Sequence, residues 1–105
     1  MSDTNVSVAH AVLVEEEVQF TLVELCRACD AESEQLVALV EEGVLTPIGD
    51  EPRHWRFGDT SLRRARAAVR LTRDLELNAA GVALVLDLLD EIEALRSRLR
   101  RLGDA

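Results

Sequence analysis

The segment from Phe20 to Leu45, FTLVELCRACDAESEQLVALVEEGVL, constrains the fold more than any other part of the chain. Thr21 and Glu24 stand at capping-box spacing, which predicts a helix that begins directly after Thr21. Asp30 breaks this helix, and a second one follows two or three residues later, with apolar residues at helical spacing. Two short helices joined by a tight turn predict a helix-turn-helix.

Short alternating segments flank this motif at 18–20 and 55–57, and we expect them to pair as the small two-stranded wing of a winged helix-turn-helix. Asp59 or Thr60 is expected to cap a third helix over 62–77, and Asn78 a fourth over 79–102 that Gly103 ends. The predicted fold is mainly α. Its three parts are a flexible acidic tail (1–16), a winged helix-turn-helix domain (17–77) and a C-terminal dimerisation or packing helix (78–105).

The charge of the chain is unevenly distributed. The formal net charge is −8 and the isoelectric point is near 4.7. Residues 1–52 hold twelve acidic groups and one basic group, a net charge of −11, whereas residues 53–105 hold eight acidic groups and eleven arginines, a net charge of +3. An acidic chain has the wrong sign for a general nucleic-acid binder.

The motifs indicate neither a metal-binding protein nor an enzyme. Cys26 and Cys29 are three apart, and a zinc site would need two further ligands, for which only the isolated His10 and His54 are present. We therefore interpret Cys26 as a core residue and predict no metal and no cofactor. There is no Gly-rich phosphate loop, nucleophile elbow or Ser/His/Asp arrangement, so we do not expect an enzyme.

The expected compartment is the bacterial cytoplasm. Two cysteines without a second pair make no disulfide framework, which favours a reducing setting. The N-terminus lacks the basic start and apolar core of a signal peptide. The longest apolar run, Val82 to Leu86, is too short to span a bilayer, so no membrane partner is expected.

The second helix of the motif is acidic where a DNA reader is basic. It offers four carboxylates, Glu32, Glu34, Glu41 and Glu42, and only Gln35 as a side-chain donor. Carboxylates are repelled by phosphates, and no counterion release would drive binding. Two readings stay open, namely a solvated polar face and a docking surface for a basic protein partner.

Arginines form a stripe along the third predicted helix. Arg63, Arg66, Arg70 and Arg73 recur at i, i+3, i+7 and i+10, which places them on one side. We expect ion pairs with carboxylates of the same domain, such as Glu24 or Asp74, or a solvated face. Contact with DNA, helped by Arg53 and Arg56 in the wing, is the remaining alternative.

The last predicted helix carries a heptad repeat, here called the seam. β-Branched residues lead at its first position and leucine fills the second, the pattern that favours a parallel two-stranded coil and hence a homodimer. Packing of this helix on its own domain is the alternative. The seam residues are Val85, Leu88, Ile92, Leu95, Leu99 and Leu102.

Three blocks of the sequence resemble a known family: QFTLVELCRAC at 19–29, EEGVLTP at 41–47, and the stretch from Trp55 to Leu99. The resemblance as a whole extends to about Leu102. The chain looks like the CbpM-like chaperone modulators, a branch of the MerR-type winged helix-turn-helix group. A MerR-type DNA reader usually shows an Arg-Tyr-Tyr-like run where this chain has Val37, Ala38 and Leu39. Residues 1–16 find no counterpart.

The resemblance implies a protein partner. Such modulators bind the J-domain of a DnaJ/CbpA-like co-chaperone and inhibit its Hsp70 and DNA-binding activities. An acidic modulator covering the basic J-domain helix that engages Hsp70 would compete directly. We expect charged contacts from Glu34, Glu41 and Glu42 around an apolar centre of Val37 and Ala38. The alternative is a MerR-type dimeric transcription regulator that binds DNA.

Overall fold

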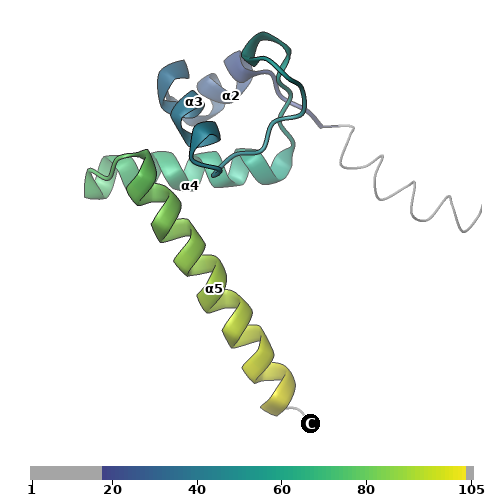
Figure 1. The fold of residues 1–105 in the computed structure, drawn as a ribbon, viewed down its shortest axis with the longest axis vertical. Coiled ribbons are helices and arrows are strands. Elements are labelled where there is room, and N and C mark those ends of the chain that lie inside the picture. Colours follow the sequence, from purple (N-terminus) through teal and green to yellow (C-terminus); the bar gives the residue numbers. More distant parts are fainter. Residues whose placement is uncertain (1–17, 104–105) are drawn as a thin grey trace, which may run out of the picture.

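The computed structural model describes residues 18–103, which are mainly helical as the sequence predicted. Figure 1 shows a short helical pair, α2 and α3, lying over a longer helix, α4, with α5 running away from one end of α4. A 3₁₀ helix, η1, lies in the segment that joins α3 to α4. The bounds are α2 Leu22–Cys29, α3 Ser33–Glu41, η1 Pro52–His54, α4 Asp59–Leu75 and α5 Ala79–Gly103.

The ends of α2 and α3 are set by local hydrogen bonds and by residues in the left-handed conformation. The Glu24 amide donates to Thr21 Oγ1 (3.1 Å) and the Thr21 amide donates to Glu24 Oε1 (2.8 Å), so the predicted capping box is confirmed. Asp30 ends α2 in the left-handed conformation, with φ of 55°. At the end of α3, Gly43 has φ of 80°, which glycine adopts without steric cost.

The predicted ends of the third helix were wrong by a few residues. Gly58, rather than Asp59 or Thr60, is the N-cap of α4, and no side chain caps this end. The helix stops at Leu75 because Glu76 turns into the left-handed conformation, with φ of 56°. The cap of α5 is confirmed, since the Gly81 amide donates to Asn78 Oδ1 at 2.8 Å.

The predicted two-stranded wing is not confirmed. Phe20 and Phe57 exchange two backbone hydrogen bonds of 2.7 and 2.8 Å, and Ile48 and Arg56 exchange two of 2.8 and 2.9 Å. These are isolated antiparallel bridges, and no strand forms within residues 18–103. The Phe20–Phe57 bridge does not extend into strands, because α2 begins at Leu22 and α4 begins at Asp59. The Ile48–Arg56 bridge is limited by Gly49, which has φ of 120°, and by η1.

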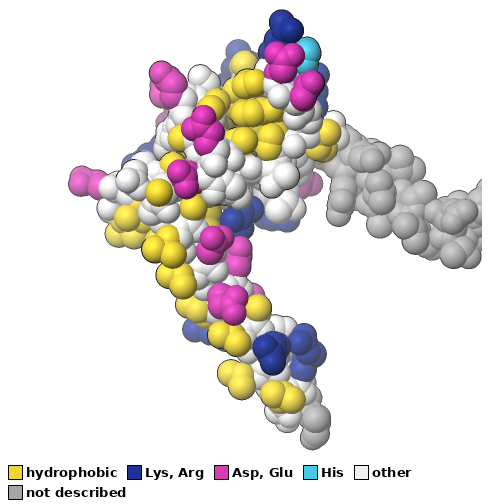
Figure 2. Space-filling model, in the orientation of Figure 1, with side chains coloured by type: hydrophobic (Ala, Val, Ile, Leu, Met, Phe, Trp, Pro, Cys, Tyr) yellow, Lys and Arg dark blue, Asp and Glu magenta, His cyan; other side chains and the backbone are white. Residues whose placement is uncertain are grey.

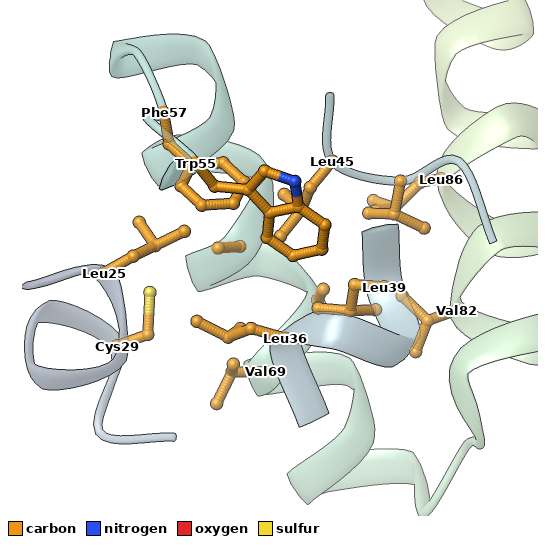
Figure 3. Packing of buried hydrophobic residues seen from close by; sticks show 13 residues of the cluster. Leu25, Cys29, Leu36, Leu39, Leu45, Trp55, Phe57, Val69, Val82 and Leu86 are labelled. Carbon is orange, nitrogen blue, oxygen red and sulfur yellow. The ribbon is translucent and has the colours of Figure 1, made fainter. Parts of the chain in front are cut away.

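The core lies where α2, α3, α4 and the start of α5 meet, around the one aromatic pair of the described region (Figure 3). The rings of Trp55 and Phe57 pack edge to face, with centroids 5.9 Å apart at 84°. Cys29 is buried in this core, and Cys26 is partly buried and packs against it, in line with the interpretation of Cys26 as a core residue. Helix α2 meets the core along Leu25 and Cys29, four residues apart.

Helix α5 belongs to the domain only at its start. Val82 and Leu86 are buried in the core, whereas every residue from Asp87 to Arg96 is exposed. Figure 1 shows the rest of α5 extending alone beyond the other helices. Among the described residues, no helix is long and apolar enough to cross a membrane.

Candidate protein-docking faces

Helix α3 brings the five predicted partner-binding residues to one side, here called the acidic face: Glu34, Val37, Ala38, Glu41 and Glu42. Leu36 and Leu39 are buried on the opposite side, as expected when successive residues turn by about 100° around a helix axis. The three glutamates are exposed, and Val37 and Ala38 are partly buried. Val37 also packs against the core, so the apolar centre of the face is only partly available.

The glutamates of the acidic face have no cationic partner within the described region. No arginine or histidine of residues 18–103 lies within 4.0 Å of the carboxylates of Glu34, Glu41 or Glu42. Their charges therefore act on the solvent side of the helix. Such a face attracts a cationic partner and repels a phosphate backbone.

The arginine stripe of α4 is a solvated face. Arg63, Arg66, Arg70 and Arg73 are all exposed, and none forms an ion pair with a carboxylate of residues 18–103, so the expected pairing with Glu24 or Asp74 is not found. Arg73 donates to the Asp30 backbone carbonyl at 3.3 Å, and Arg63 makes a long contact with the Thr60 hydroxyl at 3.5 Å.

Arg64, which lies beside the stripe, was not singled out by sequence reasoning. Its Nε donates to the Val44 carbonyl at 2.8 Å and its Nη1 donates to Asp90 Oδ2 at 3.1 Å. The three residues come from the loop after α3, from α4 and from α5. Because Val44 and Asp90 lie 20 and 26 positions from Arg64 in the sequence, no local sequence pattern predicts the contacts of Arg64.

The seam of α5 faces away from the domain. Val85 is partly buried, and the five remaining seam residues are 44–71% exposed. Figure 2 shows hydrophobic side chains running along the edge of α5 that points away from the other helices. The seam residues from Leu88 to Leu102 are therefore not buried against the domain within residues 18–103. An apolar row on an otherwise unsupported helix is typical of a contact with another chain.

The cysteines and the histidine of the described region show no arrangement for catalysis. Burial raises the pKa of the Cys29 thiol, with a smaller opposing effect of the nearby Arg66 guanidinium. Burial, followed by the Glu32 carboxylate, raises the pKa of Cys26. Both thiols are thus held in the neutral, less nucleophilic form. His54 Nδ1 lies 3.8 Å from carboxylate oxygens of Asp50 and Glu51, and all three side chains are exposed, as in ordinary surface ion pairs.

Fold and sequence similarity define the class of this protein. Residues 20–104 match the sequence pattern of the MerR HTH family regulatory proteins, so the chain belongs to that family. Within it, the chain belongs with the chaperone modulatory proteins CbpM. It is 38% identical to CbpM of Coxiella burnetii over 91 residues, 87% of this chain and 86% of the relative. It is 41% identical to CbpM of Pseudomonas putida and 39% identical to CbpM of Pseudomonas entomophila, each over 80 residues, 76% of this chain and 79% of the relative.

Proposed function

We propose that this protein is a chaperone modulator that binds the J-domain of a DnaJ/CbpA-like co-chaperone through the acidic face of α3. The observation that carries the proposal is a helix-turn-helix whose second helix presents three exposed, unpaired glutamates within the described region instead of base-reading side chains. The names of the CbpM relatives support a role in modulating a chaperone.

The proposed mechanism is occlusion and needs no catalysis. The acidic face meets the basic J-domain helix that engages Hsp70, and Val37 and Ala38 supply the apolar centre of the contact. While the modulator is bound, Hsp70 and DNA are kept from the co-chaperone. Charge complementarity of this kind mainly speeds association and selects the partner. We infer that the protein works in the bacterial cytoplasm, where J-proteins and Hsp70 meet.

Calorimetric titration of this protein into an isolated J-domain from the same organism tests the proposal. We expect saturable binding that weakens as salt rises. Salt screens the long-range attraction between the acidic face and a basic partner, with a Debye length of about 10 Å at 0.1 M ionic strength. The double variant Glu41→Arg/Glu42→Arg should weaken binding at least tenfold, mainly through a slower association rate. Absence of binding to both the J-domain and the full-length co-chaperone would contradict the proposed function.

Matched variants separate the acidic face from overall charge. Asp50→Arg/Glu51→Arg changes the net charge by the same amount on an exposed turn outside α3, and its affinity should stay close to that of the unmodified protein. Asp87→Arg tests α5, which also carries exposed carboxylates, at a position outside the seam. If only the α5 variant loses affinity, the function stands but the docking site lies on α5.

We also propose that the protein is a homodimer through the seam of α5. The support is the exposure of Leu88, Ile92, Leu95, Leu99 and Leu102 on a helix that extends beyond its own domain. Pairing two such rows removes roughly 1,000 Å² of largely apolar surface from water, close to the lower end of the range for specific interfaces. Glu91 and Arg96 are exposed beside the seam and would face each other across a parallel pair.

A further inference from the structure

Helix α5 is held to the domain only over its first two turns. Val82 and Leu86 are buried in the core, and Ala79 and Ala83 are partly buried against it. Asp90 continues the row of Val82 and Leu86 at the same four-residue spacing. Beyond Asp90, the described residues of α5 are exposed, apart from the partly buried Ser97. The contact made by Asp90 is therefore the outermost point at which the direction of α5 is set.

Arg64 makes this outermost contact and joins it to the end of α3. Its side chain is 27% exposed, and separate nitrogens donate to the Val44 carbonyl and to the Asp90 carboxylate. A planar guanidinium that bonds two partners at once has its orientation fixed by both, which a single surface ion pair does not achieve.

Val44 is itself rigidly held. It follows the left-handed Gly43 in a Schellman motif, in which the Val44 amide donates to the Leu39 carbonyl (2.9 Å) and the Gly43 amide to the Val40 carbonyl (3.0 Å). Val44 is also buried. The carbonyl that accepts from Arg64 is thus a fixed extension of α3, two residues after the acidic face ends at Glu42.

We propose that Arg64 is a positioning residue that fixes the direction of α5 relative to α3. The contact of Arg64 with Val44 and Asp90 sets the angle between the acidic face and the seam. In a homodimer it therefore sets how far apart the two acidic faces stand. The 12 residues that follow Asp90, up to Leu102, extend the helix by about 18 Å, so a tilt of about 10° at Asp90 moves the end of the helix by about 3 Å.

Residual dipolar couplings of the full chain test this role. In the unmodified protein, the couplings of α5 and those of α2–α4 should fit a single molecular alignment. In Arg64→Met, which keeps an unbranched apolar stem, and in Asp90→Ala, which removes the acceptor, the two sets should need different alignments. Arg70→Met is the matched control, because Arg70 is exposed on the same helix and makes no side-chain hydrogen bond or ion pair within residues 18–103.

The outcomes are distinct. A single alignment in both Arg64→Met and Asp90→Ala would overturn the proposal, even if the melting temperature fell, since lower stability alone does not reorient a helix. Should Arg64→Met fail to fold, Asp90→Ala decides, because Asp90 is largely exposed. The measurement requires no J-domain, so failure of the protein to bind one leaves the result for Arg64 intact.

Discussion

Replacing Leu95 by alanine gives the sharpest test of the proposed dimer. Leu95 is 46% exposed in the single chain, so nearly half of its side chain is available to be buried by a partner. The substitution removes three carbons at about 0.8 kcal/mol each, which, scaled by the exposed fraction, is about 1 kcal/mol per copy. A dimer loses the contact twice, about 2 kcal/mol, so the dissociation constant should rise roughly 30-fold.

Sedimentation equilibrium over a range of protein concentrations measures this change. Leu75→Ala is the matched control, because Leu75 is 60% exposed but lies at the end of α4, outside α5. Its dissociation constant should change much less. The free energy of unfolding of the monomer should change by less than about 0.5 kcal/mol in Leu95→Ala, since the deleted atoms already face water. Equal dissociation constants for Leu95→Ala and the unmodified protein would refute the assignment of the seam.

Three further predictions concern the fold and its pH dependence. Phe57→Ala should lower the free energy of unfolding by about 3–5 kcal/mol in urea titrations, because Phe57 is fully buried, whereas the exposed Val23→Ala should change it little; equal effects would contradict the assigned core. Gly43→Ala should cost about 1 kcal/mol from its φ of 80° alone, since no atom lies within 4 Å of an added Cβ, and Gly103→Ala, equally open but without a positive φ, should not show that loss. Burial raises the pKa of both cysteine thiols in the folded protein. Their contribution to the free energy of unfolding is therefore complete below the pKa of an unfolded cysteine, about 8.5, and is lost as the pH rises through the pKa of the folded state. The chain has no lysine or tyrosine side chain to obscure this range, and a free energy of unfolding that stays constant from pH 8 to 10 would contradict the burial of the thiols.

The predictions that held are those in which one local contact decides the structure. The capping box of Thr21 and Glu24 and the cap at Asn78 involve residues three apart, so the hydrogen bonds form as soon as the helix does. The acidic face was also predictable, because helical periodicity alone places Glu34 and Glu41 on the side opposite Leu36.

The predictions that failed depend on distant parts of the chain. The start of α4 follows a bridge between Phe20 and Phe57, and this long-range contact leaves Gly58, not a capping side chain, at the helix start. The wing required extended pairing of 18–20 with 55–57, but only the Phe20–Phe57 bridge forms, because α2 begins at Leu22 and α4 begins at Asp59.

The sequence by itself determined the helical composition, the polar side and the apolar side of α3, the seam of α5, and the family. Each of these follows from periodicity, from capping residues, or from similarity over most of the chain. Only the tertiary structure decided that the seam faces away from the domain and that Arg64 joins Val44 to Asp90. Periodicity gives which residues share a side of a helix. The direction in which that side points is fixed by contacts between segments far apart in the chain, and no local pattern carries them.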